Sequence, residues 1–524
     1  NLTGSAFNDT LVGDSGANTI SGGLGNDLLD GGSGSAGDTL IGGSGIDTAT
    51  YANAAAGVTV SLSSSLAGLQ SGDGAGDSFI GVENLTGSAF GDTLIGDGAA
   101  NTLAGGAGDD ILEGMGGGDT LIGGSGSNTA SYEHSNAGVI ASLASPGVNS
   151  GDAYGDNYTN IQNLTGSAYN DILVGDGGVN TLTGGSGDDT LEGMGGGDTL
   201  VGGSGSNTAS YEHATAGVIA SLANPAINSG DAAGDTYTSI QNLTGSAFND
   251  TLVGDMGANI ISGGLGNDTL DGGAGTAGDI FIGGSGIDTV TYANATAGVT
   301  VSLTSSLAVL QSGDGSFDYF SGIENLTGSA YGDILIGDEG GNSISGGGGD
   351  DILEGMGGGD TLIGGGGSNT ASYEHSAAGV VASLTNSAAN SGDAAGDSYV
   401  NIQNLTGSGF DDILVGDSGA NIISGGLGND LIDGGAGIAG DTFIGGSGSD
   451  TVTYANAAAG VTASLNGGLA SLQSGDAVGD SFAGIENLTG SAFNDSLIGD
   501  EGSNTLSGGD GNDVLEGMGG ADIL

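Results

Sequence analysis

Glycine and aspartate recur together at a nine-residue interval along this chain. GGAGDDILEGMGGGDTLIGGSGSNT (residues 105–129) holds three near-copies of one unit, in which Asp or Asn returns at the ninth place. Glycine allows the positive φ and close backbone approach that bring several carbonyl groups toward one point. Carbonyl oxygens beside a carboxylate form the hard oxygen cage that calcium prefers, whereas magnesium demands stricter octahedral geometry. Zinc would favour His or Cys, and Cys is absent.

The charge of the chain also indicates an external cation. Its 524 residues include 63 Asp plus Glu, no Lys or Arg and three His, which gives a formal charge of −63. Self-repulsion opposes compaction, although 36% of the residues are apolar and could build a core. Since no basic residue balances the acids, we expect metal cations to do so. Nothing in the chain can neutralise phosphates, which excludes nucleic acid as a partner, and no run of about 18 apolar residues predicts a membrane span.

The elements that must position these turns repeat at a second, longer interval. NLTGS recurs at seven places, separated by 83 or 79 residues, and defines two variants of one long unit. The repeats predict one continuous solenoid with A-type copies at 1–83, 242–324 and 404–486, B-type copies at 84–162, 163–241 and 325–403, and a partial B-type copy at 487–524.

Each long unit opens with five short rungs of the pattern apolar, any, Gly, Gly, any, Gly, any, Asp, Thr. The pattern predicts a three-residue strand with its aliphatic side chain inward, followed by a six-residue turn, and the frequency of glycine excludes helix. Turns on alternating sides give roughly 18 residues per coil of stacked parallel strands. We expect the solenoid to continue through the spacer of each unit, where residues 57–62 and 77–85 are predicted strands. The fold class is therefore all-β, a parallel β-solenoid.

The nonapeptide resembles the GGxGxDxUx repeat of the RTX (repeats-in-toxin) calcium-binding proteins, over essentially the whole chain. The resemblance implies a right-handed parallel β-roll in which successive turns on one side share Ca²⁺. Ten turns match GGxGxD fully, and they end in Asp27, Asp47, Asp110, Asp189, Asp268, Asp288, Asp351, Asp430, Asp450 and Asp513.

The resemblance further implies that the first and third rungs share one ion, the third and fifth another, and the second and fourth a third on the opposite edge. The first rung departs from the motif, since Phe90 stands where glycine belongs, and the B-type fifth rung ends in Asn128, Asn207 or Asn369, where we expect weaker or empty sites. Further metal ligands are then expected in the first rung at Asp9, Asp92, Asp171, Asp250, Asp333, Asp412 and Asp495, and in the fourth at Asp38, Asp119, Asp198, Asp279, Asp360, Asp441 and Asp522.

Other recurring residues have simpler interpretations. Asp73 and Asp77 of the spacer, with their equivalents, are expected in a solvated loop. NLT is interpreted as a strand-to-turn motif rather than a glycosylation sequon. The histidines of the YEH motif are expected to have a surface or stacking role, because A-type copies place YAN there and no nucleophile lies nearby; they are His134, His213 and His375. One aromatic residue per unit is expected to fill the core, at Phe7, Phe90, Tyr169, Phe248, Tyr331, Phe410 and Phe493.

The repeats leave no segment for a catalytic domain, so we expect no enzyme activity. The pattern favours a bacterial extracellular structural protein, secreted or on the cell surface, that folds and stiffens on binding calcium. It would serve as a filament, adhesin stalk or surface-layer element, and would associate end to end or continue as a longer array. The alternative is the calcium-binding region of a secreted enzyme or toxin whose active domain lies outside this segment. An ice-binding solenoid is disfavoured because the threonine row is uneven.

Overall fold

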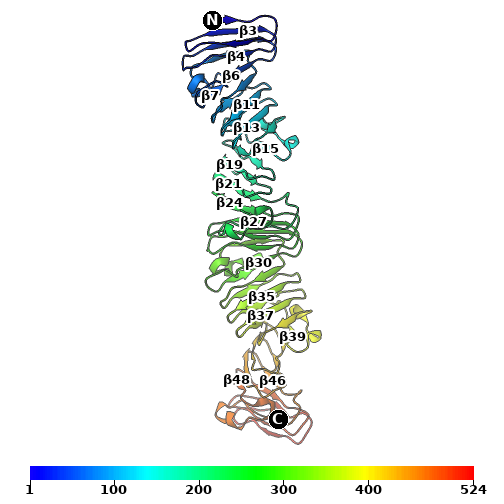
Figure 1. Ribbon diagram of the computed structural model, residues 1–524. Helices are drawn as coiled ribbons and strands as arrows, with labels where there is room; N and C mark the ends of the chain where they lie inside the picture. The colour runs from blue at the N-terminus through cyan, green and yellow to red at the C-terminus, as the bar shows by residue number, and fades with distance from the viewer. The chain divides into compact units, whose positions relative to one another are not determined.

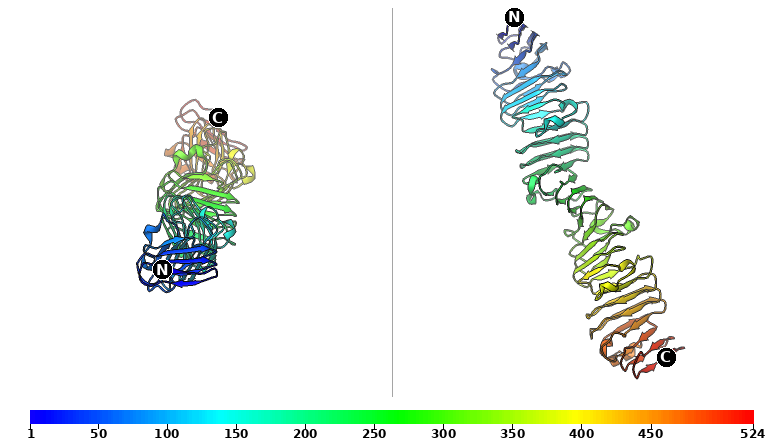
Figure 2. Two further views of the ribbon diagram at one scale, coloured as in Figure 1. Left: turned by 90° about the horizontal axis from the view of Figure 1, so that it is seen from above. Right: turned by 90° about the vertical axis from the view of Figure 1, so that its right-hand side faces the viewer.

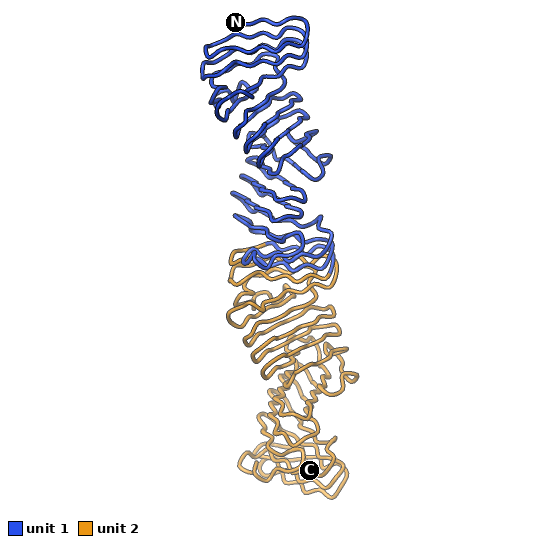
Figure 3. The backbone as a smooth tube through the Cα atoms, viewed as in Figure 1, with its two compact units in different colours: residues 1–254, 260–266 blue, residues 255–259, 267–524 orange.

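The computed structural model describes residues 1–524 as 52 short β-strands and 12 turns of 3₁₀-helix (Figure 1). No helix is long and apolar enough to cross a membrane. The chain divides into two compact units, residues 1–254 with 260–266 and residues 255–259 with 267–524 (Figure 3). Within each unit the strands are stacked as parallel rungs, and two further views show the same stacking (Figure 2).

The first A-type and first B-type copies give the order of elements that the later copies repeat. The A-type copy contains β1 (Leu2–Thr3), β2 (Thr10–Val12), β3 (Thr19–Leu24), β4 (Leu28–Asp30), β5 (Thr39–Ser44), β6 (Thr48–Thr50), β7 (Thr59–Ser61), η1 (Ala67–Leu69), η2 (Gly72–Gly74) and β8 (Ser78–Ile80). The B-type copy contains β9 (Asn84–Thr86), β10 (Thr93–Ile95), β11 (Thr102–Ala107), β12 (Ile111–Glu113), β13 (Thr120–Ser125), β14 (Thr129–Ser131), β15 (Ile140–Ser142), η3 (Pro146–Val148), η4 (Gly151–Ala153) and β16 (Asn157–Thr159).

Alternate rungs lie on opposite faces of the coil. One sheet of the first unit has the order β2-β4-β6-β9-β11-β13-β16, and the opposite face carries β7-β10-β12-β14-β17-β19-β21-β24, where β17 is Asn163–Thr165, β19 Thr181–Ser186, β21 Thr199–Ser204 and β24 Thr236–Thr238. Leu103 pairs with Leu121, 18 residues later, and Leu94 with Leu112 on the other face. The predicted parallel coil of 18 residues is therefore confirmed.

The core is a stack of single aliphatic residues, one from each rung. Leu85, Leu103 and Leu121 follow one another on one face, and all are fully buried. Neighbouring threonines on the same strands point outward because successive side chains of a strand alternate between its two sides. Burial of each leucine contributes on the order of 1.5–3 kcal/mol to folding.

The spacer of each unit is built into the same sheets. β7 pairs with β10 and β8 pairs with β5, which confirms the strands predicted at 57–62 and 77–85. Between them the chain makes two 3₁₀ turns and folds back through an antiparallel bridge between Thr59 and Ser71. Each spacer thus ends one sheet with a strand such as β8 and begins the next sheet with a strand such as β7.

The recurring aromatic residues were wrongly predicted to fill the core. Phe90 is 46% exposed, and its six equivalents are also exposed. The ring position falls in the first turn of the unit, beyond the strand whose Leu85 points inward, and the backbone of Phe90 lies directly beneath Gly108. The buried rings lie elsewhere: Phe281 of β29 (Ile280–Ser285) is buried and stacks on Phe320 of the spacer strand β32 (Tyr319–Ser321), with the ring centroids 5.6 Å apart.

Candidate metal centre

The turn aspartates form two ladders, one along each edge of the coil. In the first B-type copy, the backbone N–H of Asp92 donates to Asp110 Oδ1 (2.9 Å), and the N–H of Asp110 donates to Asn128 Oδ1 (3.0 Å). On the opposite edge, Asn101 N–H donates to Asp119 Oδ1 (2.8 Å). The same bond is accepted by Asp27, Asp38, Asp47, Asp189, Asp198, Asp279, Asp288, Asp351, Asp360, Asp430, Asp441, Asp450, Asp513 and Asp522.

These bonds occupy one carboxylate oxygen and leave the other free. Oδ2 of Asp110 is buried and has no hydrogen-bond partner, and burial of an unpaired anion is costly. A polar atom left in this state in a chain without Lys or Arg requires a cation or a proton. The same orphaned oxygen occurs at Asp27, Asp47, Asp119, Asp189, Asp198, Asp288, Asp351, Asp360, Asp430 and Asp450.

The free oxygen faces the first glycine of its own turn. A Cβ atom added at Gly22 would collide with Asp27 Oδ2 and lie 2.7 Å from the carbonyl oxygen of Gly42, one coil further on. The absence of a side chain therefore leaves a space lined by a carboxylate and a backbone carbonyl oxygen. The turn continues through Gly23 and Gly25, both at φ 114°. This donor set fits Ca²⁺, which takes six to eight oxygen ligands.

Burial makes these carboxyl groups hard to ionise without a cation. It raises the pKa of Asp110 to about 6 and that of Asp119 to about 7, and neighbouring acids raise both further, against the lowering effect of the donated backbone N–H. The pKa is also raised to about 6 at Asp189, Asp351 and Asp430, and to about 7 at Asp198, Asp279, Asp360 and Asp441.

The first-rung aspartates have a different environment. Both oxygens of Asp92 are occupied, since Ser88 N–H donates to Oδ2 (2.5 Å) and Val58 N–H to Oδ1 (2.7 Å). The serine stands where the motif has its second glycine. The arrangement recurs at Asp171, Asp250, Asp333, Asp412 and Asp495, whereas Asp9 accepts only the serine N–H.

The B-type fifth rung closes with a hydrogen bond. Asn128 Nδ2 donates to the carbonyl oxygen of Asn160 (3.1 Å), and this nitrogen faces Gly123, just as the aspartate Oδ2 faces the first glycine elsewhere. Asn207 and Asn369 make the same bond. An amide donor therefore replaces the orphaned oxygen at these turns.

The spacer aspartate Asp77 was wrongly predicted to be solvated. It is buried, its Oδ1 accepts the N–H of Asp38 (2.8 Å), and its Oδ2 accepts the hydroxyl of Tyr51 (2.7 Å). The spacer rejoins the sheet at β8, so Asp77 takes the place of the next turn aspartate. The sequence signal for this burial is a GD-x-x-GD motif directly before a strand, as in residues 151–156. Asp73 is half-buried, and its Oδ1 accepts the N–H of Gly34.

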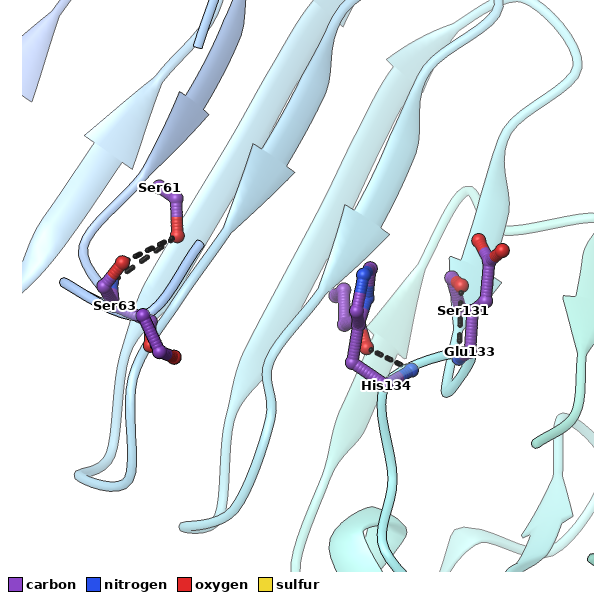
Figure 4. Close-up of polar contacts among 7 residues, drawn as sticks. Ser61, Ser63, Ser131, Glu133 and His134 are labelled. Atoms are coloured by element: carbon purple, nitrogen blue, oxygen red, sulfur yellow. Dashed lines mark hydrogen bonds and ion pairs between the residues drawn. The ribbon is translucent and has the colours of Figure 1, made fainter. Parts of the chain in front are cut away.

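The three histidines pair with buried glutamates. His134 Nδ1 lies 2.8 Å from Glu113 Oε2, and its backbone N–H donates to Oε1 (2.9 Å); Figure 4 shows His134 beside its neighbours Ser131 and Glu133. In the A-type copy Asn53 Nδ2 donates to Asp30 Oδ2 (3.0 Å) at the same place. In the sequence, B-type copies combine a Glu with a His where A-type copies combine an Asp with an Asn, and this paired difference is the signal for the contact.

No three side chains of His, Cys, Asp or Glu come together in the structure. Each turn instead offers one carboxylate together with backbone oxygens, as the glycine pattern requires.

The comparisons with known proteins agree with this donor set. The family model described as RTX calcium-binding nonapeptide repeat (4 copies) matches more than half of the chain, at residues 3–36, 77–112, 95–130, 160–191, 174–209, 244–277, 319–353, 336–371, 406–438, 439–453 and 483–524. No curated protein matches the chain in sequence. The matches span both compact units, and the chain therefore belongs to the RTX calcium-binding nonapeptide repeat family.

Proposed function

We propose that this chain is an extracellular structural protein that folds and stiffens when Ca²⁺ fills its turns. The observation that carries the proposal is the orphaned, buried Oδ2 that recurs beside a glycine carbonyl along both edges of the coil. Calcium would supply the positive charge that the chain lacks. Asp110 and its equivalents would hold it through Oδ2, while Oδ1 stays bonded to the neighbouring coil.

The site also supports a place outside the cell. Calcium is abundant there, and sites of modest affinity fill at millimolar concentrations, whereas cytosolic calcium would leave them empty. The absence of Lys and Arg removes every cleavage site for trypsin-like proteases. We propose a secreted or cell-surface protein of bacterial type.

A structural role without catalysis is favoured because all parts of each copy contribute to the stacked sheets. Strands, turns and spacers of each copy enter the same sheets, and the buried acids of the turns are bound to backbone N–H groups. We propose a filament, adhesin stalk or surface-layer element, which associates with further copies end to end or continues in a longer array.

Circular dichroism at pH 8 and low salt tests the proposal. In excess EGTA the chain should lack a β-spectrum, and added Ca²⁺ should restore it, because metal binding supplies folding free energy. A β-spectrum that persists in excess chelator would refute the proposal.

A further inference from the structure

The spacer aspartate of each B-type copy lies outside the nonapeptide repeats but inside the ladder. Asp156 directly precedes β16 and is buried, and the family matches at 95–130 and 160–191 leave it out. Its Oδ1 accepts the N–H of Asp119 (2.8 Å), just as Asp119 Oδ1 accepts the N–H of Asn101. Asp156 therefore extends the metal-binding edge beyond the last nonapeptide turn.

Two buried carboxyl groups are neighbours at this point. Burial and the charge of Asp156, whose Oδ1 accepts the backbone N–H of Asp119, raise the pKa of the Asp119 carboxyl group, and Asp119 Oδ2 is buried without a hydrogen-bond partner. Asp198 with Asp235, and Asp360 with Asp397, repeat both features. Two neighbouring anions repel each other strongly in a medium of low dielectric constant, and the chain has no Lys or Arg to separate them.

A tyrosine network fixes the orientation of the spacer carboxylate. Tyr132, itself buried, donates its hydroxyl to Asp156 Oδ2 (2.9 Å) and contacts the hydroxyl of Tyr158, which accepts from Asn149 Nδ2 (2.9 Å). Outer hydrogen bonds of this kind orient the carboxylate ligands of metal sites. A-type copies keep the tyrosine that donates to the spacer aspartate, as Tyr51 does to Asp77, but have phenylalanine in place of Tyr158, so only the second tyrosine is specific to B-type copies. The phenylalanines are Phe79, Phe320 and Phe482.

We propose that each complete B-type copy holds an additional divalent cation, of the calcium class, between its fourth-rung aspartate and its spacer aspartate. The sites pair Asp119 with Asp156, Asp198 with Asp235, and Asp360 with Asp397. The carbonyl oxygen of Gly155 is a further candidate ligand, since it lies 3.5 Å from where a Cβ of Gly118 would be. The inference rests on the proposed function, because it takes calcium as the ion that fills this edge.

The test counts bound calcium on the full chain at pH 8 by equilibrium dialysis and metal analysis. The triple variant Asp156→Asn, Asp235→Asn, Asp397→Asn should lose one ion for each changed copy. The matched control is Asp152→Asn, Asp231→Asn, Asp393→Asn, which removes the same charge from the same loop but from half-buried positions, and it should keep the wild-type count.

An unchanged count in the first variant would overturn the inference and assign a shared proton to each pair. If that variant shows no calcium-induced β-spectrum, the single variant Asp156→Asn decides by the loss or retention of one ion. A wild-type chain that binds no calcium would instead refute the proposed function itself.

Discussion

At the scale of the residue, the two oxygens of each turn aspartate have separate tasks. Asp110 Oδ1 joins neighbouring coils by a hydrogen bond, and Oδ2 is left free toward the glycine space. Where backbone N–H groups fill both oxygens, as at Asp92, neither oxygen is left free toward the first glycine of the turn. We therefore expect the third and fourth rungs to dominate calcium binding.

Replacement of Asp110 by Ala should reduce the bound calcium, because it removes an orphaned charged oxygen. Asn128→Ala should leave the calcium count unchanged and lower the free energy of unfolding by about 1 kcal/mol, since it removes only amide hydrogen bonds. Calorimetric titration and thermal unfolding of the two variants would measure both effects. An equal loss of calcium in the two variants would contradict the proposal that Asp110 binds the metal and that Asn128 only makes hydrogen bonds.

Calcium binding should weaken as the pH falls. The pKa values of about 6 at Asp110 and about 7 at Asp119 lie above the ordinary value of 3.8, so the metal-free fold favours the protonated groups. Their contribution to the free energy of unfolding of the metal-free chain is fully present below pH 3.8 and is lost as the pH rises through 6 to 7.

Two measurements check this dependence. In EGTA, the β-spectrum should increase when the pH is lowered from about 8 to about 5. Calcium should displace protons, so that a weakly buffered sample acidifies on addition of Ca²⁺ near pH 6.5, and more calcium is needed there than at pH 8. Equal affinity at both pH values would show that these groups are already ionised.

At the scale of the element, each strand is held mainly by the inward side chain at its centre. Leu103→Ala in β11 should lower the free energy of unfolding by about 2–5 kcal/mol, because it leaves a cavity between Leu85 and Leu121. Thr102→Ala on the same strand should change it by less than about 0.5 kcal/mol. Denaturant unfolding in saturating calcium measures both, and similar losses would contradict a core of one residue per rung.

The Glu113–His134 pair links the end of β12 to the loop after β14. The A-type copies have an Asp–Asn pair at the same place. Glu113→Asp alone should destabilise the fold, because the shorter carboxylate no longer reaches His134. The double variant Glu113→Asp, His134→Asn reproduces the Asp30–Asn53 pair and should recover part of the loss. A double-mutant cycle measures the coupling, and strictly additive effects would show that the two residues act independently.

Much of this architecture could be predicted from the sequence. The spacing of glycine and aspartate determines the number of residues per coil and the positions of the turns along its edges. The ladder at Asp27 and Asp110 follows from an 18- or 20-residue repeat alone. The burial of Asp156 was missed although a GD-x-x-GD motif precedes the strand, because it depends on where the spacer loop rejoins the sheet. The direction of Phe90 was missed for a related reason: its position in a turn, rather than its apolar character, decides its exposure.

At the scale of the whole molecule, the charge of −63 sets the conditions for folding. Part of the repulsion acts between exposed acids and falls with ionic strength, since the Debye length is about 3 Å in 1 M salt. The rest acts at buried oxygens, such as those of Asp110 and Asp119, where screening by salt is much weaker. Screening and site binding therefore have separable effects on the fold.

Sodium chloride at about 1 M with excess EGTA should therefore fail to give the β-spectrum, whereas a few millimolar Ca²⁺ at low salt should give it in full. Magnesium at the same concentration should be less effective, because it keeps its waters and requires octahedral geometry that glycine carbonyls in a turn do not provide. Circular dichroism under the three conditions, at one pH and one protein concentration, makes the comparison. Full folding in salt and chelator would mean that general screening is enough and that the orphaned oxygens hold protons. Equal folding in magnesium would mean that the turns recognise charge alone, and the glycine cage would then have no part in selecting the ion.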